Sequence, residues 1–206
     1  MKIVEQSADL MFITPNACEL IEAAGRTCYK SEGKSTPGSA APFCASLIKR
    51  GHLSVLEHGT ATFRFVCDRG VTHELVRHRL ASYSQESTRY CNYGSMSGEI
   101  SVIEPPGLSD VQKHTWQVAM RFAESNYLAM LAAGSSPQIA RSVLPTCLKT
   151  EIVVTANFRE WLKIIELRTS PKAHPQIREL ILKAVSILRG KYPSIFEMDE
   201  AKGETR

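Results

Sequence analysis

Apolar residues recur every three or four positions over several stretches of the chain, which is the spacing of a helix with one buried face. Two of these stretches begin at capping signals. Ser109, with Gln112 three residues later, predicts a capping box for a long helix that ends at Gly134. Asn157 and Glu160 form a similar pair for a second helix. The same spacing predicts further helices over residues 17–28, 40–49, 71–79, 136–144 and 176–189.

Three other segments have the composition or alternation of strands. Residues 59–68 alternate small or polar side chains with Phe63, Phe65 and Cys67, which predicts a half-buried strand. A β-rich run follows at residues 150–156, and residues 2–5 form a candidate edge strand. We therefore predict the α+β class, with a small antiparallel sheet flanked by long helices.

The composition favours a single soluble domain. A chain of 206 residues with 43% hydrophobic and 22% charged residues can bury a sizeable core without disulfides or metals. We expect one domain over residues 1–206, with a mobile tail at 199–206. The first residues lack the apolar core of a signal peptide, and no stretch has the length of a membrane span. We expect a cytoplasmic protein without a membrane partner.

The distribution of charge along the chain is more informative than the net charge. The formal net charge of +4 is too small to indicate a nucleic-acid partner. Five arginines and no lysine lie between Phe63 and Tyr90, namely Arg64, Arg69, Arg77, Arg79 and Arg89. Arginine binds phosphate and planar anions through two parallel hydrogen bonds. The cluster therefore predicts small anionic ligands.

The cysteines and histidines give no sign of a metal. Six cysteines are scattered along the chain without a C-x-x-C pair, and we expect them to be reduced and mostly buried. The six histidines do not supply the clustered spacing of a zinc site. We predict that the protein holds no metal.

The segment from Arg77 to Tyr90 combines arginines with many hydroxyl side chains. If Arg77 and Arg79 were both helical, they would point about 200° apart, since successive residues of a helix differ by about 100°. They would then serve different ligands or different subunits. The simpler alternative is a solvated basic helix followed by a polar loop, because arginines at helix ends often only complement the helix dipole.

Several blocks of this sequence match a known family. Arg77-His78-Arg79 is followed by seven residues and Ser87, and three further regions carry family motifs. They are Gly51-His52 with Leu56-Glu57-His58, the run Ile139-Ala140-Arg141-Ser142-Val143-Leu144-Pro145, and Asn157-Phe158-Arg159. In this order the blocks resemble the flavin-dependent thymidylate synthases, and the resemblance covers residues 51–196.

The resemblance implies an enzyme that methylates dUMP to dTMP. FAD would be the cofactor, with NADPH as its reductant and 5,10-methylenetetrahydrofolate as the carbon donor. The family resemblance also implies a homotetramer whose active sites lie at subunit interfaces. The partners would be further copies of this chain and small molecules, with no nucleic acid.

The resemblance also implies site residues. The expected dUMP contacts are Glu74, Arg77, Gln85, Glu86, Ser87, Thr88, Arg89, Arg141 and Arg168. The expected FAD contacts are Ser54, Arg77, His78, Arg79, Gln85, Asn157, Arg159, Lys163 and His174. Arg168 is the expected catalytic residue, because a guanidinium beside the uracil ring stabilises the negative charge that develops there.

Two positions depart from the family pattern. Ser84 and Gln85 stand where many members carry an amide followed by a carboxylate, and the neighbouring Glu86 would compensate in part. A longer segment between Arg168 and His174 weakens the assignment of His174 to FAD.

Alternatives remain for the chemistry and for the class of protein. Cys147 or Ser87 would be the enzyme nucleophile if the reaction used one, although neither has a base placed beside it by the sequence. A different class would be a non-catalytic RNA-binding protein in which tyrosines stack on bases among the arginines. Its stacking residues would be Tyr83, Tyr90 and Tyr93.

Overall fold

The computed structural model describes residues 1–197, which fold into two compact units. The first unit contains residues 1–7, 65–77 and 84–152, and the second contains residues 8–64, 78–83 and the chain from Val153. The long strands β3 (Thr60–Asp68) and β6 (Lys149–Asn157) each contribute residues to both units. Each unit is described by itself.

Four strands form the main sheet in the order β2-β3-β6-β4, with β2 at Ser7–Ile13 and β4 at Ala81–Gln85. The backbone amide of Phe158, just after β6, donates to the carbonyl of Gly59, just before β3. The amide of Glu86, just after β4, donates to Glu151 near the start of β6. In both pairs the end of one strand meets the beginning of its neighbour. These strands are therefore antiparallel, as predicted.

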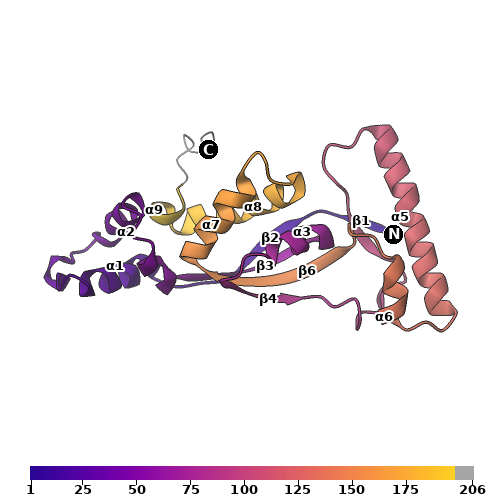
Figure 1. Cartoon of the computed structure of the whole chain (residues 1–206), viewed down its shortest axis with the longest axis horizontal. Coiled ribbons are helices and arrows are strands. Elements are labelled where there is room, and N and C mark those ends of the chain that lie inside the picture. Colours follow the sequence, from indigo (N-terminus) through magenta and orange to yellow (C-terminus); the bar gives the residue numbers. More distant parts are fainter. Residues whose placement is uncertain (198–206) are drawn as a thin grey trace. The chain divides into compact units, whose positions relative to one another are not determined.

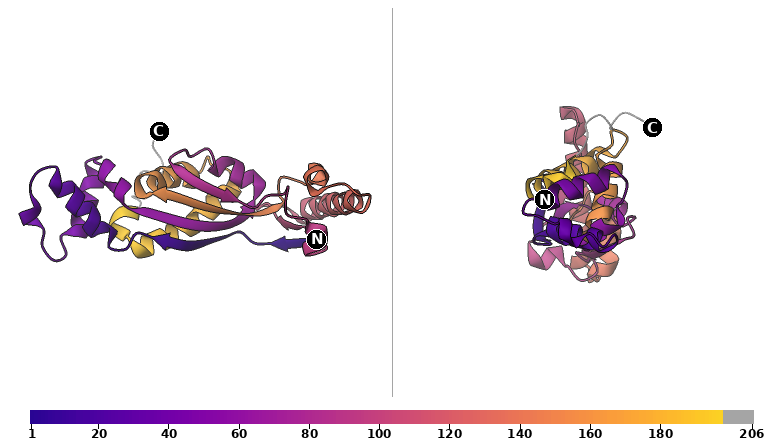
Figure 2. Two further views of the ribbon diagram at one scale, coloured as in Figure 1. Left: turned by 90° about the horizontal axis from the view of Figure 1, so that it is seen from below. Right: turned by 90° about the vertical axis from the view of Figure 1, so that its left-hand side faces the viewer.

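In the second unit, α7 (Phe158–Thr169) and α8 (Pro175–Lys191) lie side by side along one face of the strands (Figures 1 and 2). The indole of Trp161 is fully buried, and its Nε1 donates to the carbonyl of Ala61 over 3.0 Å. Its ring also meets Phe63 edge-on at 5.1 Å. The alternation of β3 thus buries Phe63 against Trp161 of α7, on the buried side that the sequence pattern predicts for this strand.

The second unit also holds a pair of helices joined by a buried carboxylate. Glu22 of α1 (Ala17–Thr27) accepts hydrogen bonds from Arg26 in the same helix and from Ser39, 2.7 Å away at the start of α2 (Ala40–Lys49). Burial alone would raise the pKa of Glu22, but the Ser39 hydroxyl and the Arg26 guanidinium bring it below its ordinary value. The remaining short helices are η1 (Glu32–Lys34), η2 (Ser54–His58) and α9 (Pro193–Phe196).

The first unit is built around the long helix α5 (Asp110–Ala132), drawn in pink in Figure 1. Tyr127 of α5 is fully buried in a cluster with Ile100, Val102, Ala140 and Leu148. Trp116 packs against this cluster and is only half-buried, whereas Trp161 is a complete core residue. The other elements are β1 (Lys2–Val4) paired in parallel with β5 (Ser101–Ile103), and α3 (Arg69–Leu75), α4 (Tyr93–Met96), α6 (Pro137–Ala140) and η3 (Arg141–Val143).

The capping signals in the sequence are confirmed. Ser109 and Gln112 form both hydrogen bonds of a capping box at the start of α5. After this helix, Gly134 adopts a φ of 89°, a conformation that favours glycine and ends the helix. Asn157 caps α7 by accepting from the amide of Glu160 over 2.8 Å.

The helix predicted over residues 71–79 ends early, and this prediction was wrong. Helix α3 runs from Arg69 to Leu75, and residues 76–80 form turns and bends. The chain leaves the helix because His78 is buried beside α7, and the hydroxyl of Tyr83 donates to the His78 carbonyl over 2.7 Å. The helical angle between Arg77 and Arg79 therefore does not apply.

Three strands were missed, namely β2, β4 and β5. The predicted tail at 199–206 lies outside the described residues. No helix within residues 1–197 is long and apolar enough to cross a membrane. Over the same residues, no group of three or more potential ligands could hold a metal ion.

Candidate active site

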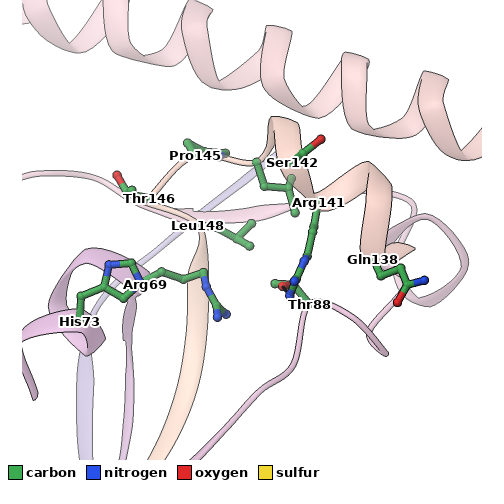
Figure 3. Close-up of a pocket in the computed structure, with 10 residues that line it drawn as sticks. Arg69, His73, Thr88, Gln138, Arg141, Ser142, Pro145, Thr146 and Leu148 are labelled. Carbon is green, nitrogen blue, oxygen red and sulfur yellow. Dashed lines mark hydrogen bonds between the residues drawn. The ribbon is translucent and has the colours of Figure 1, made fainter. Parts of the chain in front are cut away.

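The first unit contains a cavity of about 460 Å³, a size that falls within the range of small-molecule sites. It opens between α3, the loop after β4 and the α6–η3 segment (Figure 3). Its lining residues are Arg69, His73, Thr88, Gln138, Arg141, Ser142, Leu144, Pro145, Thr146 and Leu148.

Two arginines give the cavity its chemical character. Arg141 Nη1 donates to the hydroxyl of Thr88 over 3.2 Å, and Figure 3 shows their side chains together. Arg69, at the first position of α3, extends into the same space, and His73 lies one turn later. Guanidinium and hydroxyl donors around one cavity are chemically suited to a phosphate or another small anion.

The loop after β4 is held by the backbone of Ser87. The amides of Tyr90 and Cys91 both donate to the Ser87 carbonyl, and the amide of Arg89 donates to its hydroxyl over 3.3 Å. The Arg89 guanidinium lies 5.5 Å from the centre of the Tyr90 ring. This compact turn presents Thr88 to the cavity and leaves Arg89 exposed.

Gln85 has its amide fixed by two buried hydroxyls. Its Nε2 donates to Thr72 over 3.0 Å and to Thr150 over 3.3 Å. The Thr72 hydroxyl already gives its proton to the carbonyl of Arg69, so toward Gln85 it can only accept. The Gln85 side chain therefore meets both threonines through its amide nitrogen, and its carbonyl oxygen takes part in neither hydrogen bond.

Glu86 is engaged within the first unit. Its carboxylate accepts from the Tyr93 hydroxyl over 2.6 Å and from Lys149 Nζ over 3.2 Å. Burial and this neighbouring carboxylate raise the pKa of Tyr93 above its usual range. Of the other expected dUMP residues in this unit, Glu74 is half-buried near the end of α3 and Arg77 is exposed. Their contacts with dUMP remain predictions.

In the second unit, His78 and Arg168 are joined. Arg168 Nε donates to Nε2 of the His78 ring over 3.0 Å, and only 5% of His78 is exposed. Burial, together with the positive charges of Arg168 and Lys163, lowers the pKa of His78 to about 4. The imidazole is therefore neutral at pH 7. Its Nε2 accepts the hydrogen bond from Arg168 and so orients the guanidinium.

The other expected FAD residues of the second unit form a mostly exposed basic set. Arg159 and Lys163 stand four residues apart on α7, so they lie on one face of the helix. Arg159 forms an ion pair with Glu57 at 2.6 Å. Arg79, Ser54 and His174 are also exposed. Cationic and hydroxyl donors of this kind fit the diphosphate of FAD.

The sequence did not predict every residue of the cavity. Arg69 was noticed only as part of the arginine cluster, and His73 and Gln138 carried no signal because they belong to no motif. Glu160 was predicted only as part of a helix cap. Its side chain instead faces His78, which is 82 positions away in the sequence.

None of the cysteines is placed as an activated nucleophile near the cavity. Cys147 is half-buried next to a cavity residue, and burial raises its pKa to about 11. Its Sγ lies 3.0 Å from the Sδ of Met120. A thiol with this pKa is protonated at pH 7 and is therefore a weak nucleophile. All six cysteines are free, but only Cys18, Cys44 and Cys67 are fully buried, fewer than expected.

Comparisons with known proteins agree with the resemblance in the sequence. The family described as thymidylate synthase complementing protein, Thy1, matches residues 9–194. A flavin-dependent thymidylate synthase from Mycobacterium avium (strain 104) is 36% identical over 197 residues, covering 86% of this chain and 77% of that protein.

Two solved structures share the fold. A UMP/dUMP methylase, PolB, from Streptomyces cacaoi bound with 5-Br dUMP has a TM-score of 0.83 at 22% identity, covering 100% of this chain and 99% of that chain. Thymidylate Synthase X from Helicobacter pylori with FAD and dUMP has a TM-score of 0.78 at 24% identity, covering 93% and 97%. The family match and the mycobacterial relative together show that this chain belongs to the Thy1 family of flavin-dependent thymidylate synthases.

Proposed function

We propose that this protein converts dUMP to dTMP by reductive methylation, with 5,10-methylenetetrahydrofolate as the carbon donor and FAD reduced by NADPH as the reductant. Family membership supports the reaction, as do similar folds crystallised with dUMP or 5-Br dUMP. The observation that carries the proposal is the cavity of the first unit. There Thr88 and Arg141, both expected from the sequence to contact dUMP, are hydrogen bonded to each other.

The nucleotide phosphate is the proposed occupant of this cavity. A dianionic phosphate is matched by the paired donors of a guanidinium and by hydroxyl groups. Arg141 and Thr88 supply both kinds of donor, and Arg69 adds a second positive charge to the same cavity. Ser87 and Arg89 flank Thr88 in the chain. Ser87 stabilises the turn by accepting from the amide of Arg89, and Arg89 adds a further guanidinium to the donors.

Arg168 is the proposed catalytic residue. The C5 carbon of uracil is a poor nucleophile until negative charge develops on the ring, and a guanidinium beside the ring stabilises that charge as it forms. Arg168 is suited to this role because His78 holds its Nε in a fixed direction. A fixed donor costs little reorganisation in the transition state.

FAD supplies the redox chemistry when bound. In this proposal Arg79, Arg159 and Lys163 bind its diphosphate, while Asn157 orders the first turn of α7. His78 mainly orients Arg168, because one of its ring nitrogens accepts from Arg168 and the other lies beside Glu160. Ser54, Gln85 and His174 remain expected contacts.

The reaction we propose does not use an enzyme nucleophile. Cys147 has a raised pKa, which argues against a thiolate that attacks the uracil ring. The Ser87 hydroxyl accepts from the amide of Arg89, and within residues 1–197 no general base is placed beside it. An unassisted serine is a weak nucleophile. Ser87 therefore acts as a substrate contact. The proposed assembly is a homotetramer with active sites shared between subunits, as the family resemblance implies.

The decisive experiment is an assay for dTMP with purified protein, dUMP, methylenetetrahydrofolate and NADPH, with each component omitted in turn. We expect a yellow protein with flavin absorbance, and turnover that requires all components. The Arg168→Ala and Arg89→Ala variants should lose most of the activity. A colourless protein that cannot be reconstituted with FAD, or one that binds RNA instead, would overturn the proposal.

A further inference from the structure

Glu160 is a buried acid that the proposed reaction has not used. Its side chain is only 3% exposed, and it stands at the third position of α7. A glutamate at this position often turns back to bind the amide of the capping residue. Here its Oε1 lies instead 3.6 Å from Nδ1 of His78. Within residues 1–197 this oxygen has no hydrogen-bond partner, so burying it requires another explanation.

The hydrogen bond from Arg168 favours one tautomer of His78, and a second group is needed to hold that tautomer alone. Arg168 is always a donor, so the His78 Nε2 that receives its Nε–H must offer a lone pair. A neutral imidazole with a lone pair on Nε2 carries its proton on Nδ1. Nδ1 is the ring nitrogen that lies 3.6 Å from Oε1 of Glu160. The three side chains thus form one row, from the Glu160 carboxylate through the imidazole to the guanidinium.

Burial and nearby positive charges keep the His78 ring neutral. Burial lowers the pKa of His78 to about 4, together with the positive charges of Arg168 and Lys163 on α7. Tyr83, whose hydroxyl binds the His78 backbone, has its pKa raised to about 12 by burial and by Glu160. The Glu160–His78 contact at pH 7 is therefore made with a neutral imidazole and is not an ion pair.

His78 lies between two residues of α7. Glu160 and Arg168 are eight residues apart on this helix, which corresponds to about 12 Å along its axis. The imidazole of His78 bridges them from the turn before β4 and is itself held by Tyr83.

The geometry points to Glu160 as a positioning residue: it holds His78 as the Nδ1–H tautomer, and through His78 it fixes the direction of the Arg168 guanidinium. This inference rests on the proposed role of Arg168 in catalysis. Glu160 itself touches neither substrate nor cofactor in this arrangement. Groups that orient the ligands of metal sites typically change activity by about 10–100-fold when they are removed, and we expect an effect of the same size here.

The tautomer can be measured without turnover. Protein labelled with ¹⁵N-histidine would be studied by magic-angle-spinning NMR at pH 7, with the His78 signals assigned by their loss in His78→Gln. We expect a protonated Nδ1 and an unprotonated Nε2 in the wild type. Glu160→Leu should give a mixture of tautomers, whereas Glu160→Gln keeps an acceptor for Nδ1–H and should retain the wild-type spectrum.

Steady-state kinetics supply the second readout. Glu160→Leu should lower kcat by about 10–100-fold while the KM for dUMP changes little, and Glu160→Gln should restore most of kcat. Glu166→Gln is the matched control, because Glu166 is an exposed acid on the same helix. It should leave both the spectrum and kcat unchanged.

Two outcomes overturn the inference: a wild-type His78 protonated on Nε2, or a folded Glu160→Leu variant with an unchanged tautomer and kcat. If Glu160→Leu does not fold, the wild-type spectrum still tests the inference, because a His78 protonated on Nε2 offers Glu160 no Nδ1–H to accept from. If the protein does not methylate dUMP, the proposed function fails, and the spectra still test the role of Glu160 separately.

Discussion

Gln85 Nε2 donates to the Thr72 hydroxyl over 3.0 Å, and the proton of that hydroxyl is already committed to the carbonyl of Arg69. An amide satisfies this arrangement, and an ionised carboxylate does not, because it can only accept. The hydrogen bonds around position 85 therefore fit the amide of Gln85, the residue at which the sequence was expected to depart from the family pattern.

The first prediction concerns Gln85→Glu. At pH 7 the free energy of unfolding of the variant should be about 1–3 kcal/mol lower than that of the wild type. A buried hydrogen bond is lost, and a charge is placed beside two buried hydroxyls. Burial raises the pKa of such a glutamate, so the deficit should shrink as the pH falls through that pKa. Urea unfolding at pH 7 and pH 5 measures both effects. Ser84→Asp, at the exposed neighbour, serves as the control.

The second prediction concerns the phosphate site. Arg141→Ala should weaken dUMP binding by about 10–100-fold, since a hydrogen bond to a charged group contributes about 1.5–3 kcal/mol. Calorimetric titration at two salt concentrations tests this, and the wild type should show the stronger salt dependence. Arg121→Ala removes an exposed arginine from α5 and should have no effect. Equal dUMP affinity for both variants would exclude Arg141 from the site.

The third prediction concerns Cys147. Because its pKa is about 11, Cys147→Ala should keep kcat within about threefold, and iodoacetamide should not inactivate the wild type at pH 7. The exposed Cys28 provides the comparison, as Cys28→Ser should behave in the same way. A loss of activity by several orders of magnitude in Cys147→Ala alone would restore the cysteine as nucleophile.

The fourth prediction concerns pH and His78. Its folded pKa of about 4 lies below the usual value of 6.5, so between these values the unfolded chain binds the proton more readily. Stability should therefore fall as the pH decreases from about 6.5 to about 4, by a few kcal/mol at most. Urea unfolding of the wild type across this range should show the decline. The free energy of unfolding of His78→Gln should depend less on pH than that of the wild type. An equal pH dependence of the two proteins would contradict the lowered pKa of His78.

The sequence predicts those elements whose signals are local. The capping box at Ser109 and the alternation around Phe63 depend on residues a few positions apart, and both appear in the structure. Strand β4 was missed because Ser82, Ser84 and Gln85 are polar and lack the apolar alternation of a half-buried strand. Strand β4 pairs with β6, which lies far away in the chain, and such a pairing leaves no local signal in the sequence.

The site shows the same limit. Thr88 and Arg141 were expected from family motifs, and the structure brings them into one cavity. The contact of His78 with Glu160 could not be predicted, because the local pattern around Glu160 is that of an ordinary helix cap. The end of α3 was placed too late for a related reason, since the burial of His78 overrides the helical spacing that continues through Arg77.

The carboxylate of Glu22 has a consequence for how this protein comes apart in acid. Its depressed pKa means that the bonds to Ser39 and Arg26 stabilise the fold at neutral pH and are lost when the pH falls through that pKa. A protonated Glu22 ties α1 to the start of α2 less strongly, because a neutral carboxyl group is a weaker acceptor. The connection between these helices should then become the earliest site of cleavage by an acid protease, before the strands of the sheet are accessible.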